Sequence, residues 1–292
     1  MLGYLGPRGT YSESAAHFFV NVLQWATPLQ MTPIGSISHV LDEVESGKVS
    51  LGVVPLENSL EGSVLVTLDR LASSPILIRA EVVVPIRHMV FGLPGTDPAR
   101  VARVFSHPQA LAQCRNTLYA HFPNAEHVDF DSTAGAVKFV AKEGNHAFVA
   151  VGSRESGARL GVVTLLEDAQ DAQGNVTRFA LISRADRRVD IDLAAVGQTE
   201  QNTLEKTSVL LALGDDHPGA LYEVLRVFAK NDVNLSKLES RPTRKGLGSY
   251  HFYIDLVGDP QAPHIRNALN AVEAIQGFSM KNIGSYPCFT LM

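Results

Sequence analysis

The sequence has little of what marks secreted, membrane-spanning or nucleic-acid-binding proteins. It contains two cysteines, Cys114 and Cys288, which are distant and form no CxxC pair, and this favours free thiols in a reducing cytoplasm. No apolar run reaches the ~18–20 residues of a membrane-spanning helix, and residues 1–10 lack the basic start and long apolar core of a signal peptide. The net charge of −5 gives no reason to expect a basic binding face. We therefore expect a cytoplasmic protein with no nucleic-acid and no membrane partner.

Cofactor and metal motifs are also missing. Gly3, Gly6 and Gly9 are spaced GxxGxxG, which is neither the dinucleotide fingerprint nor a Walker loop. The ten histidines include no HExxH and no tight cluster, and no GxSxG elbow occurs. His107 precedes Pro108 and Cys114 lies within a predicted helix, so we expect both to be structural. We expect neither a metal nor a cofactor.

Short apolar strands alternate with helical patterns in the first part of the chain, whose 292 residues are enough for two domains. Thr10 and Glu13 have the spacing of a capping box, and Ser132 is the expected N-cap of a later helix. The alternation is typical of an α/β fold with mostly parallel strands. Strands are predicted within residues 2–6, 49–59, 101–108 and 146–153, and helices over residues 10–23, 36–47, 109–122 and 132–144.

The rhythm changes near Arg184. Residues 186–204 are charged and polar with weak periodicity, which indicates a linker. The remaining chain reads as strand, helix, strand, strand, helix, strand, which is the βαββαβ order of a ferredoxin-like unit. Its strands are predicted at residues 207–213, 233–242, 248–258 and 279–287, and its helices at residues 218–232 and 262–277.

Small polar residues follow four of the predicted strands, at residues 6–10, 55–59, 106–109 and 152–156. Ligands of open α/β sheets bind beyond the carboxyl ends of the strands, and the N–H groups at helix starts suit carboxylates or phosphates. The same residue types are also ordinary caps and turns. Four such loops together favour a binding site.

A Thr-Arg pair interrupts an apolar strand in GNVTRFALI, residues 174–182. Side chains alternate between the two faces of a strand, so Thr177 would share a face with Phe179, and Arg178 with Ala180. Because Gly174 and Asn175 precede the pair, we favour an irregular strand start that lets both Thr177 and Arg178 face one cleft. A regular strand would leave Arg178 bracing the site from behind.

Taken in order, YLGPRGTYSESAA, VVPLENSLEGSV, SHPQALAQC and NVTRF resemble the prephenate dehydratase family. The later PGAL and ESRP resemble the ACT regulatory domain attached to that enzyme in bacteria. Departures are slight: Tyr11 where Phe is common and Leu56 where Ile is common. The resemblance implies an α/β, two-lobed periplasmic-binding-protein-like catalytic domain over residues 1–185, with its second lobe at about 80–165. It also implies a linker over 186–204 and a ferredoxin-like ACT domain over 205–287.

The resemblance implies a reaction that needs no cofactor. Prephenate loses carbon dioxide and its C4 hydroxyl to leave phenylpyruvate, and the departing hydroxyl accepts the electrons that a cofactor would otherwise take. The protein must orient a dianion, assist departure of the hydroxyl and avoid over-stabilising the ring carboxylate.

Family resemblance assigns the main catalytic role to Thr177, as a hydrogen-bond donor or relay to the leaving hydroxyl. Glu57 and Asn58 are the next catalytic candidates. Glu57 either polarises the hydroxyl or fixes its own loop, and the sequence leaves both roles open. The expected substrate-binding residues are Ser106, Gln113, Ser132, Thr133, Arg178 and Thr10.

The C-terminal unit is expected to be an amino-acid sensor or a dimerisation module. Resemblance to the ACT family implies that phenylalanine binds between paired copies and inhibits. We expect a homodimer or homotetramer, because one such sheet has exposed edges to cover. The expected effector-binding residues are Gly219, Ala220, Leu221, Asn234, Glu239 and Ser240.

Two other functions stay open from the sequence. An enzyme of the same chemistry could act on arogenate, where an amino acid replaces the pyruvyl group and the site must accept an ammonium. A non-catalytic two-lobed binding protein with a sensor domain would share the fold. Formation of phenylpyruvate from prephenate without added cofactor would exclude the binding protein.

Overall fold

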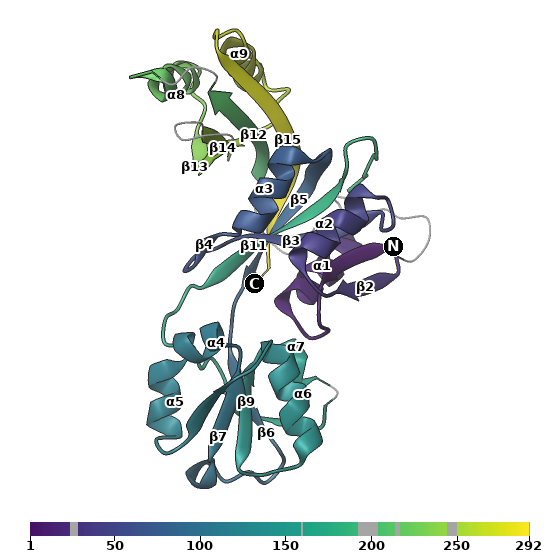
Figure 1. Cartoon of the computed structure of the whole chain (residues 1–292), viewed down its shortest axis with the longest axis vertical. Coiled ribbons are helices and arrows are strands. Elements are labelled where there is room, and N and C mark those ends of the chain that lie inside the picture. The colour runs from purple at the N-terminus through teal and green to yellow at the C-terminus, as the bar shows by residue number, and fades with distance from the viewer. Residues whose placement is uncertain (24–28, 159, 192–203, 214–216, 244–249, 292) are drawn as a thin grey trace.

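A computed structural model describes residues 1–23, 29–158, 160–191, 204–213, 217–243 and 250–291. The chain forms three units, which we call lobe 1, lobe 2 and the C-terminal unit. Lobe 1 lies between the other two along the long axis of the molecule (Figure 1). None of the helices in the described part of the chain has the length and apolar character needed to cross a bilayer.

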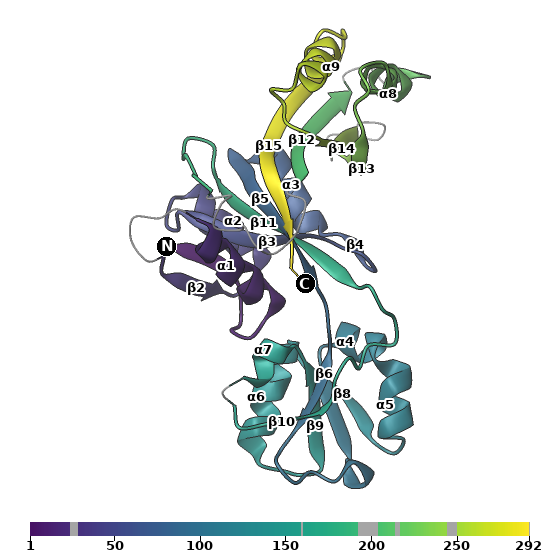
Figure 2. The ribbon, with the colours of Figure 1, turned by 180° about the vertical axis from the view of Figure 1, so that it is seen from behind.

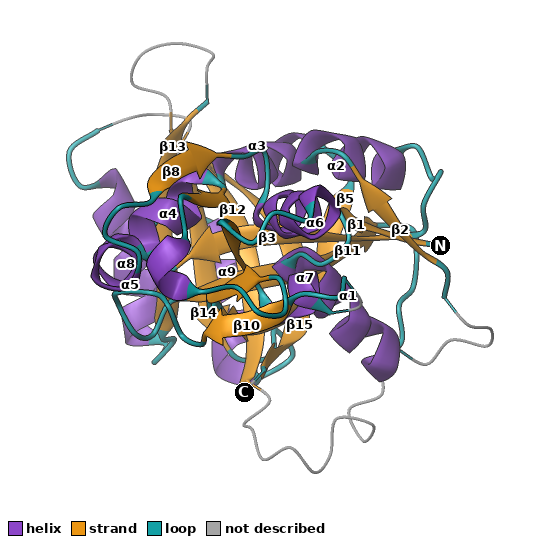
Figure 3. Ribbon diagram, turned by 90° about the horizontal axis from the view of Figure 1, so that it is seen from below, coloured by secondary structure: helices purple, strands orange, loops and turns teal. Residues whose placement is uncertain are grey.

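Lobe 1 is a mixed sheet in the order β5-β11-β3-β1-β2, with the short β4 paired to β3. Helix α1 packs against one face through Phe19, while α2 and α3 cover the other through Val40 and Leu71 (Figure 3). β1 is parallel to β2 and β3, but β11 is antiparallel to both β3 and β5, so the expected parallel pairing holds for part of the sheet. The elements are β1 Leu2–Leu5, α1 Tyr11–Val22, β2 Met31–Ile34, α2 Ile37–Glu45, β3 Leu51–Asn58, β4 Gly62–Ser63, α3 Leu65–Ser73, β5 Ile76–Pro85 and β11 Val176–Arg184.

Lobe 2 has its own sheet, in the order β10-β6-β9-β7-β8. The helix predicted over residues 109–122 is broken at Cys114 into α4 and α5. The predicted cap of α6 is confirmed, since Ser132 Oγ accepts from the Gly135 N–H. The elements are β6 Met89–Gly92, the 3₁₀ helix η1 Pro98–Arg100, β7 Arg103–Ser106, α4 Pro108–Gln113, α5 Arg115–His121, β8 Glu126–Asp129, α6 Thr133–Glu143, β9 Phe148–Gly152, α7 Arg154–Gly157 and β10 Val163–Leu166.

Two crossing segments, residues 86–88 and 167–175, join the lobes. They run side by side, because the Ile86 N–H donates to the Asn175 carbonyl at 2.8 Å and the Ala169 N–H to the His88 carbonyl at 2.7 Å. Lobe 2 therefore begins at Met89. The expected start near residue 80 falls inside β5, a strand of lobe 1.

The C-terminal unit has the predicted βαββαβ order. Helices α8 and α9 pack together on one face of its sheet, around Phe228 and Ile265, and the other face packs against α3 of lobe 1 through Leu210 and Tyr253. Of the predicted linker, residues 192–203 lie outside the described part. The elements are β12 Leu204–Leu213, α8 Ala220–Lys230, β13 Leu235–Pro242, β14 Tyr250–Val257, α9 Pro263–Glu273 and β15 Phe278–Thr290.

β15 extends past the predicted end at residue 287. Its last residues pair in parallel with β5, with Cys288 opposite Glu81 and Phe289 opposite Val82, and both Cys288 and Phe289 are buried. Figure 2 shows this strand running from the C-terminal unit into lobe 1. The sheets of the two units therefore form one continuous sheet, with ten strands in the described part of the chain.

Candidate active site at the junction of the lobes

Thr177 and Asn58 face each other across the β11–β3 ladder. Asn58 Nδ2 donates to Thr177 Oγ1 at 2.9 Å, and Asn58 Oδ1 accepts from the N–H groups of Leu60 and Glu61. These bonds fix the amide with its donor toward Thr177. Since the Thr177 oxygen accepts this bond, its own O–H proton is directed at a different acceptor. Thr177 is thus set up as a hydrogen-bond donor.

Lobe 2 reaches this pair through Gln113, the last residue of α4. Asn175 links them: its Oδ1 accepts from Asn58 Nδ2 at 2.7 Å, and its Nδ2 donates to Gln113 Oε1 at 3.3 Å. Gln113 Oε1 also lies 2.9 Å from His88 Nε2. Because both of these hydrogen bonds use the Gln113 oxygen, its NH₂ group stays available to donate to another acceptor. We call these five residues, Thr177, Asn58, Asn175, Gln113 and His88, the amide network.

His88 completes the network from the first crossing segment. Because an amide oxygen can only accept, His88 Nε2 carries the proton of this bond. Burial lowers the pKa of His88, against a raising effect of the bond to Gln113, so the ring is held neutral. The sequence did not single out His88 or Asn175. Asn175 could have been found, since it stands two residues before Thr177, whereas nothing local marks His88.

The acidic run before the Thr-Arg strand serves to place Gln113. Asp171 accepts from the N–H groups of Asn116 and Thr117 at 2.8 and 2.9 Å, which caps α5 at the break after α4. Burial raises the pKa of Asp171, but these two N–H groups and the Thr117 hydroxyl together outweigh it and lower the pKa. Gln170 Oε1 accepts from the His88 N–H at 2.9 Å. The second crossing segment therefore fixes both Gln113 and His88.

Arg178 and Glu57 lie on the opposite face from Thr177 and Asn58. The pairing of β11 is regular with β5 from Val176 to Arg178 and with β3 at Thr177 and Arg178. The expected irregular strand start is therefore wrong, and successive side chains point to opposite faces of the sheet. Arg178 Nη1 contacts Glu57 Oε2 at 2.7 Å. The expectation that Arg178 faces the cleft is therefore corrected. Of the two roles left open for Glu57, the geometry supports fixing the structure and not polarising the substrate.

The remaining predicted substrate residues cap or brace their own lobes. Ser106 is fully buried and donates to the Val151 carbonyl at 2.8 Å. Ser132 caps α6, of which Thr133 is the first residue. Thr10 Oγ1 accepts from the Glu13 N–H, while the Glu13 carboxylate takes the Gly9 N–H and so replaces the expected capping box. Contact of these four residues with substrate stays a prediction.

Two of the four polar loops meet directly. Ser153 Oγ donates to the Gly9 carbonyl at 2.9 Å. A Cβ on Gly9 would lie 2.9 Å from the Ser156 Cα, and Gly9 has φ of +83°, so only glycine fits this contact. Tyr11 Oη also donates to the Arg87 carbonyl. Lobe 1 therefore touches lobe 2 beside the amide network.

The predicted effector residues divide between two regions of the C-terminal unit. Gly219 is the N-cap of α8, which begins with Ala220 and Leu221, and Asn234 precedes β13. Alternation along β13 turns Glu239 toward lobe 1, where it accepts from Ser63 Oγ, while Ser240 is exposed. Glu239 and Ser240 thus lie on opposite faces of the strand.

Cys114 and His107 have the structural roles expected of them. Cys114 is fully buried in the core of lobe 2, and burial together with the charge of Asp171 raises the pKa of its thiol to about 12. His107 Nδ1 accepts from the Gln109 N–H and caps α4. Within the described residues, no three His, Cys, Asp or Glu side chains are grouped to hold a metal ion.

Two α/β lobes joined by two crossing segments, with a polar network between them and a ferredoxin-like unit behind, define the class: a two-lobed α/β domain with a C-terminal βαββαβ unit. The chain belongs to the prephenate dehydratase family, since the family model for prephenate dehydratase matches residues 2–187. The ACT domain model matches residues 207–274.

Similar proteins cover nearly the whole chain. A bifunctional chorismate mutase/prephenate dehydratase of Stutzerimonas stutzeri is 38% identical over 98% of this chain and 73% of its own length. A prephenate dehydratase of Methanocaldococcus jannaschii is 37% identical over 98% of this chain and 97% of its own. A crystal structure of prephenate dehydratase from Arthrobacter aurescens in complex with L-Phe aligns with a TM-score of 0.80 at 33% identity, covering 98% of this chain and 89% of that one.

Proposed function

We propose that the amide network is the active site in which prephenate becomes phenylpyruvate, carbon dioxide and water. The bond from C1 to the ring carboxylate breaks, its electron pair moves through the diene, and the C4–O bond breaks as the hydroxyl takes up a proton and leaves as water. Thr177 assists the departing oxygen as a donor or relay. The observation that carries this proposal is that the Thr177 oxygen already accepts from Asn58, which directs its proton outward.

The charge distribution around the network suits a decarboxylation. A cation bonded to the ring carboxylate would stabilise the substrate more than the transition state, in which that charge leaves as neutral carbon dioxide. Arg178 is turned to the other face of the sheet. Gln113 instead offers a neutral NH₂ group, and the loop around Ser132 and Thr133 offers helix N–H groups. These donors would orient the dianion without holding the leaving carboxylate too tightly.

The ACT domain is proposed to bind phenylalanine and inhibit. The related Arthrobacter structure is a complex with L-Phe. Gly219 and Ala220 place small residues at the start of α8, whose first turn is not capped by a side chain of the described residues, and such a helix start suits an α-carboxylate. A homodimer or homotetramer is the proposed form, because β13 leaves one edge of the long sheet unpaired within the described chain. The cytoplasm is the proposed location.

The test compares prephenate and arogenate as substrates of the purified protein without added cofactor. The ammonium of arogenate would need an anionic partner, and Glu57 is engaged on the reverse face. We therefore expect phenylpyruvate from prephenate, with kcat/KM at least about tenfold above that for arogenate. Faster conversion of arogenate would reassign the substrate. Tight binding of prephenate without turnover would make the protein a binding module.

A further inference from the structure

A cluster of charged side chains lies directly behind the proposed catalytic pair, on the other face of β3 and β11. Lobe 1 and the ACT domain contribute to it equally. We call this cluster the junction network, and its members are Arg178, Glu57 and Glu81 from lobe 1 with Lys206, Lys237 and Asp255 from the ACT domain.

Arg178 is the centre of the junction network. Its Nη1 lies 2.7 Å from Glu57 Oε2, and its Nη2 lies 2.5 Å from Glu81 Oε2 and 2.7 Å from Asp255 Oδ2. Burial alone would lower the pKa of Arg178, but Glu81 and Asp255 outweigh it and raise the pKa. The Glu81 side chain is fully buried and that of Arg178 is 16% exposed, so salt screens these contacts little.

Each charge of lobe 1 in the junction network is held by an opposite charge of the ACT domain. Lys237 Nζ contacts Glu57 Oε2 at 3.0 Å, and Lys206 Nζ contacts Glu81 Oε1 at 2.8 Å. Asp255, which contacts Arg178, is itself fixed because its Oδ1 accepts from Ser208 Oγ at 2.6 Å. A displacement of the ACT strands therefore changes the forces on Arg178 and Glu57.

Arg178 and Glu57 are the chain neighbours of Thr177 and Asn58, and the two pairs occupy successive rungs of one ladder. The ladder register shifts immediately afterwards, between Arg178 and Phe179. Because the two pairs share one backbone, a displacement of Arg178 or Glu57 changes the geometry of the Asn58–Thr177 hydrogen bond. Packed ion-pair networks of this kind can carry coupling between distant sites when they have two discrete arrangements.

We propose that Asp255 and Lys237 of the ACT domain are positioning residues for the active site, and that effector binding reaches Thr177 and Asn58 through the junction network. The proposal rests on the proposed function and names the contacts that carry its regulation. Asp255 and Lys237 touch no substrate. They act by holding Arg178 and Glu57, whose neighbours form the catalytic pair.

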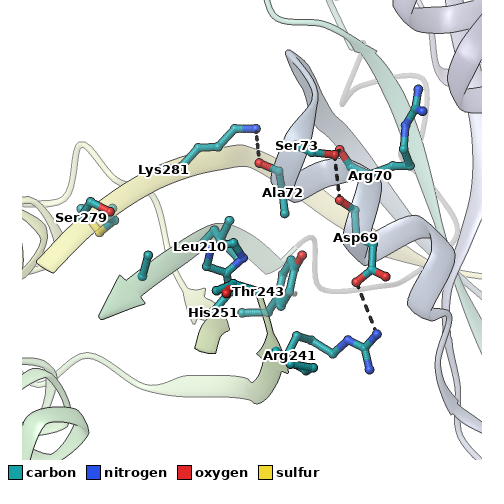
Figure 4. Close-up of a pocket in the computed structure, with 14 residues that line it drawn as sticks. Asp69, Arg70, Ala72, Ser73, Leu210, Arg241, Thr243, His251, Ser279 and Lys281 are labelled. Carbon is teal, nitrogen blue, oxygen red and sulfur yellow. Dashed lines mark hydrogen bonds and ion pairs between the residues drawn. The ribbon is translucent and has the colours of Figure 1, made fainter. Parts of the chain in front are cut away.

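The experiment uses the full-length chain with Asp255→Asn and Lys237→Met. The first keeps the shape of the side chain and its acceptor for Ser208 but removes the charge facing Arg178. The second replaces the cation facing Glu57 by an apolar chain of similar length. The matched control is Asp69→Asn, which weakens the 3.4 Å contact between Asp69 of α3 and Arg241 of β13. Figure 4 shows this second contact between lobe 1 and the ACT domain, which borders neither Thr177 nor Asn58.

Initial rates with prephenate, with and without saturating phenylalanine, give the inhibition ratio, and calorimetry gives phenylalanine binding. In both test variants we expect kcat to fall about tenfold with KM within about twofold, and the inhibition ratio to fall about fivefold or more toward one, while phenylalanine still binds. Asp69→Asn should keep the wild-type inhibition ratio.

A wild-type inhibition ratio in Asp255→Asn and Lys237→Met variants that bind phenylalanine and melt like the wild type would overturn the inference. An equal loss in Asp69→Asn would overturn it too, since any weakening of the domain contact would then suffice. If Asp255→Asn does not fold, Lys237→Met alone decides. If the wild type forms no phenylpyruvate, the proposed function is wrong. If the wild type is active and inhibited by phenylalanine, and both variants are inhibited as fully, only the role of the junction network in regulation is wrong.

Discussion

Thr177 and Arg178 are adjacent in the chain, yet the structure gives them different surroundings. Thr177 accepts from a neutral amide, Asn58, while Arg178 is held by three carboxylates. The direction of the Asn58–Thr177 hydrogen bond decides what Thr177 can do. As an acceptor from Asn58, Thr177 keeps its O–H proton available for the substrate, whereas as a donor to residue 58 it would have no proton left to donate. Reversing this one bond is therefore a sharper test than deleting it.

Asn58→Asp should reverse the bond. The substituted carboxylate can only accept, so Thr177 would donate to it and lose its proton for the substrate. We expect kcat to fall on the order of 10²-fold, measured by phenylpyruvate formation. Ser59→Ala is the control, because Ser59 touches Asn175 and the Val176 N–H without setting the direction of the bond. Near-normal kcat in Asn58→Asp would contradict the assigned polarity.

His88 makes stability depend on pH. Its pKa in the folded protein lies below the usual 6.5, so between those two values the unfolded chain binds more protons than the folded chain. The free energy of unfolding should therefore fall as pH drops through that window and recover above it. His88→Gln should reduce the loss of thermal stability between about pH 7.5 and about pH 5.5, followed by circular dichroism. An unchanged pH dependence in this variant would show that His88 is not held neutral.

At the scale of elements, β11 shows what local sequence can and cannot predict. The alternation of side chains along a strand correctly places Thr177 and Arg178 on opposite faces. The Gly174–Asn175 pair wrongly predicted an irregular strand start, because Asn175 is a member of the amide network and the pairing with β5 is already regular at Val176. The partners of Arg178 were beyond prediction, since Glu81 and Asp255 lie 97 and 77 residues away in the chain. The N-caps Thr10 and Ser132, by contrast, accept from N–H groups three residues away and were predicted, although the Glu13 carboxylate bonds the Gly9 N–H and does not complete the expected capping box.

The last strand is the element whose role the sequence hides most. Phe289 is 4% exposed and packs in the core of lobe 1, with its ring centroid 5.2 Å from that of Phe18. Phe289→Ala should therefore lower the free energy of unfolding by about 3–5 kcal/mol, measured by urea denaturation. The control is Tyr222→Ala, which removes an aromatic ring that is 64% exposed and should change the free energy of unfolding by less than about 0.5 kcal/mol. Equal effects would show that β15 does not support lobe 1.

At the scale of the whole molecule, the ACT domain and the proposed catalytic pair share one sheet. The ten-stranded sheet runs from β13 in the ACT domain to β2 in lobe 1. Lobe 2 is joined to two central strands of this sheet, β5 and β11, by the crossing segments, and it also contacts lobe 1 near Gly9. The two strands that carry the catalytic pair lie in the middle of this sheet, between the ACT strands and the outer strands of lobe 1 (Figure 1). A sensor built into the same sheet can influence the site without touching the substrate.

The most direct measurement of the central claim is kcat for prephenate in the intact protein with Thr177→Val and Thr177→Ser. Valine keeps the branched shape of threonine but has no hydroxyl, whereas serine keeps the hydroxyl and loses only a methyl group. We predict a fall of at least about 10²-fold with valine and a much smaller fall with serine, with both variants folded. A valine variant that turns over like the wild type would contradict the assignment of Thr177 as the donor to the leaving hydroxyl.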